Sequence, residues 1–209
     1  MPNKNVSELI LSHPAFSTIS EESKNKIINS TELLKFSVGQ PLAVSSIRQD
    51  KIYLIYEGEA RLLGVIDGAP FTIKKISSGE FVGLSSFLRI GPCEEISAVN
   101  DVKAISFKDN LILDLYVKEK NFKQWCNSVL FDSEIAFLSQ KLYKEISHKK
   151  IDFLDYFSLI AKKVKLYSIE NNNITPIIDS SEIYLSGSDN IINKKFGEII
   201  ESNEKIVCN

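Results

Sequence analysis

The sequence predicts an α+β fold in which an all-β sandwich or barrel lies between helical segments. From Phe36 to Phe107, short runs rich in β-branched and aromatic residues alternate with glycine or polar turns. The spacing of roughly 8 to 12 residues between turns is typical of antiparallel strands. Apolar residues at helical spacing precede this region and return at about residue 110. Strands and helices do not alternate, so a parallel sheet with crossover helices is not predicted.

Helices are predicted over about residues 7–35. The second of them begins after Ser20, a cap-like residue followed by Glu21 and Glu22, and acidic residues in a first turn suit the positive end of the helix dipole. Within the β region, the run from residue 52 to 56 is apolar at every position. This strand is therefore expected to be buried on both of its faces.

The C-terminal part is predicted to be helical and then mixed. Apolar stripes at helical spacing run through Leu111, Leu115, Phe122, Val129, Leu130, Ile135, Leu138, Leu142 and Ile146. A charged stretch begins at Ser147, a helix follows at about residues 156–169, and residues 180–200 predict a hairpin or paired strands broken by Gly187 and Asp189. We expect a first unit over residues 1–146 and a helix-plus-strand extension or linker region over residues 147–209.

Composition excludes several classes of function. The chain has 209 residues, of which 44% are apolar and 25% charged, with a formal net charge of -2, so it can build a core and is not disordered. Near-neutrality and only three arginines argue against a general nucleic-acid binder, which needs clustered basic residues.

The cysteines and the apolar runs bear on location. Cys93, Cys126 and Cys208 are far apart, without CxxC spacing, so neither a zinc site nor a disulfide framework is expected. No run of 18 apolar residues and no signal-peptide core is present, so no direct membrane insertion is expected. A reducing, cytoplasmic location is the expectation.

Four glycines identify a resemblance. Gly39, Gly58, Gly79 and Gly83 lie between predicted strands, at positions where a turn with positive φ would suit glycine. With this spacing, residues 8 to 146 resemble a cyclic-nucleotide-binding domain. The resemblance implies a double-stranded β-helix, or jelly roll, flanked by N-terminal helices and a long C-terminal helix, with a small α+β extension.

The resemblance also implies a site, which in that family is called the phosphate cassette. It consists of a short helix after the glycine that matches Gly83, together with the residues that follow this helix. The matching residues are Gly83, Leu84, Ser85, Ser86, Arg89, Glu94, Glu95, Ser97 and Ala98. In members that bind a nucleotide, the amides of this helix hold the cyclic phosphate, a glutamate takes the ribose hydroxyl, and an arginine neutralises the phosphate. Here Leu84 stands in the glutamate position and Glu94 in the arginine position, so loss of cAMP and cGMP binding is implied, and no cofactor is expected.

Two neighbouring side chains leave alternatives open. Arg89 either replaces the missing cation or forms a salt bridge with Glu94 or Glu95. Cys93 is expected to be a structural or surface thiol, because no basic residue nearby would lower its pKa.

The words GLSSFLR and PCEEISA further resemble the N-terminal regulatory region of cyanobacterial-type, bacteriocin-exporting ABC transporters, and EIYLSGSDN with FGEII resembles the link region that follows it. This implies a non-catalytic regulatory module at the cytosolic face of a membrane complex. Its partners would be other domains of a larger transporter chain or a second copy of itself.

Other functional classes have their own sequence requirements. A Crp/Fnr-type transcription regulator needs a helix-turn-helix after the connecting helix, and residues 150–209 show no compact three-helix pattern. A module that binds a different small ligand is the other alternative. An enzyme on a cupin-like roll is not expected, because His13 and His148 are too far apart to supply a metal site and no nucleophile–base pair is evident, so no catalytic residue is assigned.

Overall fold

The structure, a computed structural model, describes residues 4–89, 91, 93–145, 151–167, 183–187, 194–195 and 197–201. Its helices are α1 (Lys4–Ser12), α2 (Glu21–Ser30), α3 (Leu84–Leu88), α4 (Asp109–Lys118), α5 (Lys120–Ser128), α6 (Asp132–Glu145) and α7 (Phe153–Lys163). Its strands are β1 (Glu32–Phe36), β2 (Pro41–Ala43), β3 (Lys51–Glu57), β4 (Ala60–Ile66), β5 (Ala69–Ile76), β6 (Phe81–Val82), β7 (Ile96–Ala98) and β8 (Val102–Lys108). The predicted α+β class is confirmed.

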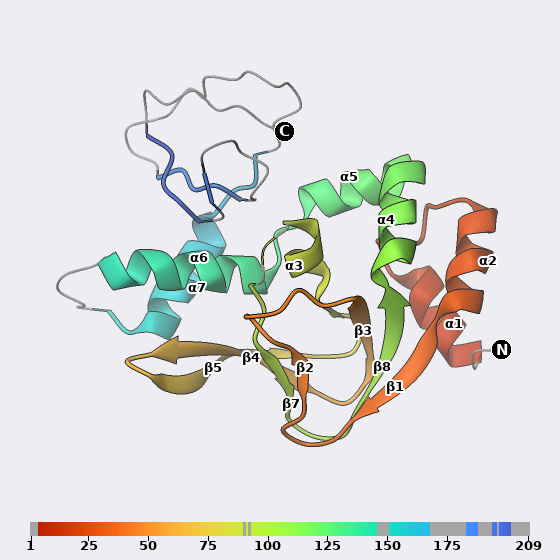
Figure 1. The fold of residues 1–209 in the computed structure, drawn as a ribbon, viewed down its shortest axis with the longest axis horizontal. Coiled ribbons are helices and arrows are strands. Elements are labelled where there is room, and N and C mark those ends of the chain that lie inside the picture. The colour runs from red at the N-terminus through yellow and green to blue at the C-terminus, as the bar shows by residue number, and fades with distance from the viewer. Residues whose placement is uncertain are drawn as a thin grey trace.

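The strands form two antiparallel sheets of four strands, ordered β1-β8-β3-β6 and β2-β7-β4-β5. Both orders bring together strands that are distant in sequence, as in a jelly roll, and β8 lies between β1 and β3. In Figure 1, α1 and α2 lie beside β1 and β8 at one side of the roll, and α6 and α7 lie over β4 and β5 at the other. The cassette helix α3 lies between these two groups of helices (Figure 1).

Strand β3 is buried on both faces, as the sequence predicts. Ile52 and Leu54 belong to a core shared with α1, α2, α4 and α5, which we call the helix-side core. Tyr53 and Ile55 belong to the core inside the roll. Successive side chains of a strand point to opposite faces, so one strand supplies both cores. Phe122 is fully buried and Trp125 packs against the helix-side core.

The region after the roll is helical, as the sequence predicts. It consists of three helices, α4, α5 and α6, of which the longest, α6, has 14 residues. The chain turns because α4 and α5 contribute to the helix-side core, whereas α6 contributes Ile135, Ala136 and Tyr143 to the core inside the roll. One straight helix could not reach both cores.

The predicted stripe on α6 mainly faces inward. Ile135 is buried, Leu138 and Leu142 are half-buried, and Ile146 lies outside the described residues. Gln140 of α6 accepts a hydrogen bond from the Val65 amide of β4 at 3.0 Å. Helix α6 therefore packs against the β4–β5 hairpin.

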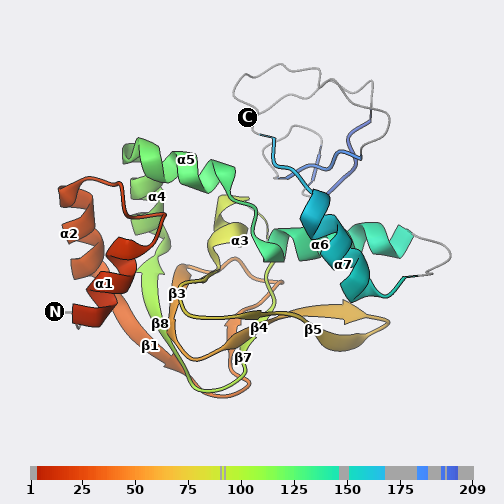
Figure 2. The same ribbon diagram turned by 180° about the vertical axis from the view of Figure 1, so that it is seen from behind.

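Helix α7 completes this packing. Asp152 caps it by accepting a hydrogen bond from the Leu154 amide at 2.8 Å, so the helix begins at Phe153. It ends at Lys163, and both ends come earlier in the chain than the sequence predicts. The Phe153 ring meets Phe71 of β5 edge-to-face at 5.3 Å. Seen from behind, α6 and α7 lie side by side above β5 (Figure 2).

Part of the predicted C-terminal pairing is present. Leu185 and Ile199 form an antiparallel bridge, and the Ile200 amide donates to the Tyr184 carbonyl at 2.9 Å. The charged stretch at residues 147–150, Asp189 and Cys208 lie outside the described residues.

Candidate functional site

The cassette begins at a glycine that no other residue could replace without strain. Gly83 has φ 87° and lies between β6 and α3, and a Cβ on it would come within 3.1 Å of the Lys51 carbonyl oxygen. Gly58 is more restricted, with φ 90° and a Cβ position 2.3 Å from the Asp101 carbonyl oxygen. Gly39 and Gly79 also have positive φ, so all four glycines of the predicted pattern turn as expected.

Leu84, which follows Gly83, does not face a polar pocket. Its side chain is fully buried in the helix-side core with residues such as Ile10 and Ile52. The position that would have to contact ribose hydroxyls is therefore used for apolar packing.

Glu94 brings its carboxylate to the beginning of α3. The side chain is 3% exposed, and its Oε2 accepts a hydrogen bond from the Ser86 amide at 3.3 Å. The Gly83 backbone and the hydroxyls of Ser85 and Ser86 also contact this carboxylate. Its Oε1 accepts from the Ser133 hydroxyl of α6 at 3.4 Å. The start of the cassette helix thus binds a carboxyl group that belongs to the chain itself.

Arg89 does not pair with Glu94 or Glu95, and this expectation is wrong. Its Nε donates to Glu134 Oε1 at 2.5 Å, and its Nη2 donates to the Val129 carbonyl at 3.0 Å. The guanidinium points from the end of α3 to the junction between α5 and α6, away from its sequence neighbours. It is therefore already engaged and cannot replace the missing cation.

Glu134 belongs to the same junction and is 1% exposed. Its Oε2 also accepts the Phe131 amide at 2.9 Å, which satisfies a free donor at the start of α6. Burial raises the pKa of this carboxyl, and the Arg89 guanidinium opposes that shift.

Hydroxyl groups connect α3 to α6, and the Cys93 thiol lies beside them. Ser85 and Ser133 share a hydrogen bond of 2.7 Å, and the Ser86 hydroxyl accepts from the Cys93 amide at 3.1 Å. The Cys93 thiol lies 3.3 Å from the Ser85 hydroxyl, and burial followed by the charge of Glu94 raises its pKa to about 12. The thiol is neutral and enclosed, so Cys93 is a structural thiol, as expected.

The remaining predicted site residues lie apart from this cluster. Glu95 is half-buried and accepts from the amide and hydroxyl of Ser45 at 2.9 and 2.8 Å. The Ser97 hydroxyl accepts from Arg61 at 3.4 Å, and Ala98 is packed in the core inside the roll. The structure therefore brings together Ser85, Ser86, Arg89 and Glu94.

Ser133 and Glu134 complete the cluster and were not predicted. The acidic first turn of α6 could have indicated a helix start. No local signal in the sequence places that start over the cassette, because the contact joins segments about 45 residues apart.

The burial of Glu94 makes the stability of the native state depend on pH. Burial raises its pKa above the ordinary value of 4.5, so from about pH 4.5 upward the native state retains a proton that the unfolded chain loses. The free energy of unfolding therefore falls as pH rises through the range between the two pKa values. We expect Glu94→Gln to reduce this fall, so that the variant gains stability relative to the wild type as pH rises. Urea unfolding from about pH 4 to pH 7 measures it, and parallel curves would contradict the expectation.

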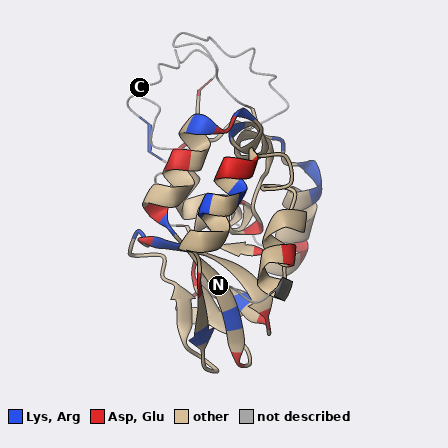
Figure 3. Cartoon of the chain, turned by 90° about the vertical axis from the view of Figure 1, so that its right-hand side faces the viewer, with Lys and Arg blue, Asp and Glu red and all other residues tan. Residues whose placement is uncertain are grey.

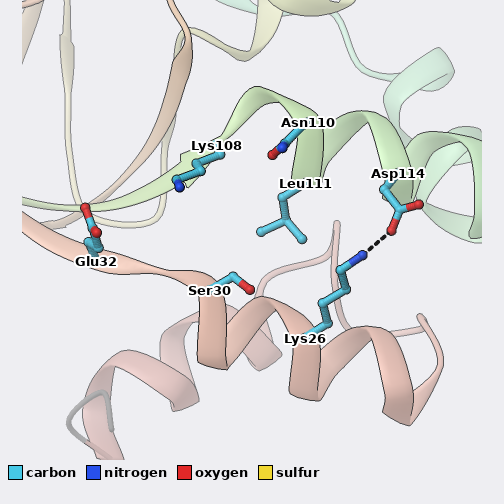
Figure 4. Close-up of a pocket in the computed structure, with 7 residues that line it drawn as sticks. All are labelled: Lys26, Ser30, Glu32, Lys108, Asn110, Leu111 and Asp114. Carbon is cyan, nitrogen blue, oxygen red and sulfur yellow. Dashed lines mark hydrogen bonds and ion pairs between the residues drawn. The ribbon is translucent and has the colours of Figure 1, made fainter.

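A hollow elsewhere on the molecule is a weaker candidate. It has a volume of about 560 Å³ and lies between α2, β1 and α4, lined by Lys26, Ser30, Glu32, Lys108, Asn110, Leu111 and Asp114 (Figure 4). Lys26 is held by Asp114 at 2.5 Å, and the two lysines face two carboxylates, so the hollow has no excess of positive charge for an anion.

The described part of the chain has no group of three potential metal ligands. Among the same residues, no helix is long and apolar enough to cross a bilayer. Over the face seen in Figure 3, basic and acidic residues are interspersed, with no continuous basic stripe.

No protein-family model matches the sequence, and no curated protein is similar enough to count as a relative. Solved structures do match. The regulatory domain of Toxoplasma gondii protein kinase A, in a co-crystal with cAMP, is 14% identical with a TM-score of 0.53, and the match covers 75% of this chain and 58% of that one.

Two further solved structures match over part of the chain. A regulatory subunit of a cAMP-independent protein kinase A from Trypanosoma brucei is 16% identical, with a TM-score of 0.45, over 56% of this chain and 48% of that one. The Thermus thermophilus catabolite activator protein is 20% identical, with a TM-score of 0.46, over 63% of this chain and 59% of that one. The chain spans about half the length of these proteins. The two antiparallel sheets, the glycine turns and the short helix after Gly83 thus form the β-roll fold of cyclic-nucleotide-binding domains.

Proposed function

We propose that this chain is a non-catalytic regulatory module whose roll works without cAMP or cGMP. The observation that carries the proposal is the position of Glu94. Its carboxylate is 3% exposed and accepts the Ser86 amide, one of the donors that would have to hold a phosphate. A phosphate placed there would have to displace this carboxyl group and would be buried without a cation beside it, which is strongly unfavourable.

Two other features support the same conclusion. Leu84 is fully buried among apolar side chains, so no acceptor is available for ribose hydroxyls at that position. Arg89 is bound to Glu134, so moving it to a phosphate would leave a buried carboxylate without its cation. Binding a cyclic nucleotide would therefore need three separate changes in the cassette.

Isothermal titration calorimetry tests the proposal directly. Titration of cAMP or cGMP into the wild-type protein should give no heat beyond dilution, even at nucleotide concentrations on the order of millimolar. A dissociation constant in the micromolar range would overturn the proposal. Heat with another nucleoside or small anion would favour instead a module for a different small ligand.

We also propose a context for the module, the cytosolic N-terminal part of a peptide-exporting ABC transporter. Its support is the resemblance of residues 83–98 and 182–200 to that region. The partners would then be other domains of the transporter chain, or a second copy that contacts the half-buried Leu138 and Leu142 of α6. Reading the gene beyond Asn209 tests this: a peptidase, a membrane domain and an ATPase in the same frame would support it, and a stop codon would oppose it.

Sequence-specific DNA binding is a weaker proposal. Within residues 151–167, 183–187, 194–195 and 197–201, the structure contains one helix, α7, and the bridge between Leu185 and Ile199. A helix-turn-helix needs two packed helices with a basic recognition helix. Retention of the protein on double-stranded DNA at physiological salt would revive this alternative.

A further inference from the structure

The carboxylate of Glu94 is buried without a cation. Among the residues that the structure describes, no lysine or arginine forms an ion pair with it, although the side chain is 3% exposed. Its partners are instead amides and hydroxyls, from Gly83, Ser85 and Ser86 on one side and Ser133 on the other. Burying this carboxyl group costs the native state stability, because its desolvation is only partly offset by neutral donors. A role in overall stability therefore does not account for it.

The donors come from two helices that are separate in the sequence. The Ser86 amide belongs to α3, while Ser133 lies in the first turn of α6. Glu94, which lies on the loop before β7, is therefore positioned to hold α3 and the start of α6 together.

Two neighbouring contacts also join α3 to α6. Ser85 bonds to Ser133 at 2.7 Å, and Arg89 bonds to Glu134 at 2.5 Å. Each of these contacts also joins the α3 segment to the first turn of α6. From there, Gln140 and Tyr143 connect α6 to the β4–β5 hairpin and to α7.

We propose that Glu94 is an internal ligand of the cassette: its carboxyl group occupies the start of α3 in place of a phosphate and, through Ser133, holds α6 docked without any added molecule. The inference rests on the proposed function and specifies how the module keeps one conformation. A bound ligand changes a conformational equilibrium only through different affinities for the two states. A permanently tethered carboxyl group instead fixes the docked state, so a change in output must come from a partner that contacts α6.

Hydrogen exchange measured by mass spectrometry tests the inference in Glu94→Ala. We expect amide exchange in the first turns of α6 to be about tenfold faster or more than in the wild type, because an anchoring acceptor is lost. Exchange in β3 and β8 should stay slow. Sodium formate, compared with sodium chloride at equal ionic strength, should restore much of the protection in Glu94→Ala, since formate can fill the emptied carboxylate position. It should have no effect on the wild type.

Glu95→Ala is the matched control. The Glu95 carboxylate is half-buried and bonds to Ser45, on the far side of the same loop from α6. This variant should exchange like the wild type along α6 and should not respond to formate. If Glu94→Ala and Glu95→Ala have the same α6 exchange, the inference is wrong.

Ser133→Ala provides a second route if Glu94→Ala does not fold. It keeps the Glu94 carboxyl group and removes the α6 hydroxyl that donates to it, so it should also speed exchange in the first turn of α6. Unchanged exchange in Ser133→Ala would overturn the inference. These outcomes are independent of the proposed function, which fails only if the wild-type protein binds cAMP or cGMP.

Discussion

Arg89→Ala is expected to lower the free energy of unfolding by about 3–5 kcal/mol, the largest effect of any single charged residue described above. The Arg89 and Glu134 side chains are 10% and 2% exposed, and their atoms are 2.5 Å apart. Removing the guanidinium leaves the Glu134 carboxylate buried without a cation, and it also removes the donor to the Val129 carbonyl. Urea unfolding at neutral pH measures the loss.

Two comparisons separate this effect from the loss of an ordinary ion pair. Lys103 pairs with Glu57 at 2.6 Å at the surface, and Lys103→Ala should hardly change the unfolding midpoint, because exposed pairs contribute little. The double variant Arg89→Met with Glu134→Leu should recover much of the stability lost in Arg89→Ala, since an apolar pair leaves no charge unpaired. A cost for Arg89→Ala no greater than for Lys103→Ala would show that the buried pair is not a link between α3 and α6.

Phe16→Ala is expected to cost about 3–5 kcal/mol, because it removes a large, fully buried ring. The Phe16 ring stacks on Phe122 of α5 at 5.7 Å and contacts Phe107 of β8 at 5.6 Å and Phe81 of β6 at 5.8 Å. It therefore joins the N-terminal helices to the sheet and to the helices that follow the roll. Its loss should loosen α1 and α2 before the roll unfolds.

The single tryptophan reports this change. Trp125 lies in the same aromatic cluster, 6.0 Å from Phe81 and 6.3 Å from Phe122, so its fluorescence should shift to longer wavelength in native Phe16→Ala. Leu113→Ala is the control, because Leu113 is 53% exposed on α4 and its loss leaves no cavity. Equal stability of the two variants would mean that the N-terminal helices are not part of the cooperative unit.

Features that depend on neighbouring residues could be predicted from the sequence. The two-residue period of a strand explains why β3 is buried on both faces. Capping chemistry explains the start of α2 at Ser20, and backbone sterics explain the four glycine turns. The departure of Leu84 and Glu94 from the nucleotide-binding pattern was also visible. The glycines predict the roll, and Leu84 and Glu94 lie in the segment that the sequence predicts as the cassette.

Features that depend on packing between distant segments could not be predicted. Arg89 has two acidic neighbours in the sequence, yet it pairs with Glu134, because the end of α3 faces the α5–α6 junction and not its own loop. The division into α4, α5 and α6 has the same origin: an apolar stripe indicates that a helix is buried, but not which of two cores it meets. Ser133 gives no signal at all until α6 is placed.

The order of strands in the first sheet has a consequence for folding during synthesis. Strand β8 lies between β1 and β3, and its pairing with β1 joins Leu34 to Ala104 and Phe36 to Val102. The sheet cannot close until residue 108 has left the ribosome, and such distant pairings make a domain fold slowly. Until then, β1 and β3 expose unpaired edges that can join other chains. A nascent chain that stalls before β8 should therefore be prone to aggregation, and fragments ending before Val102 should be insoluble.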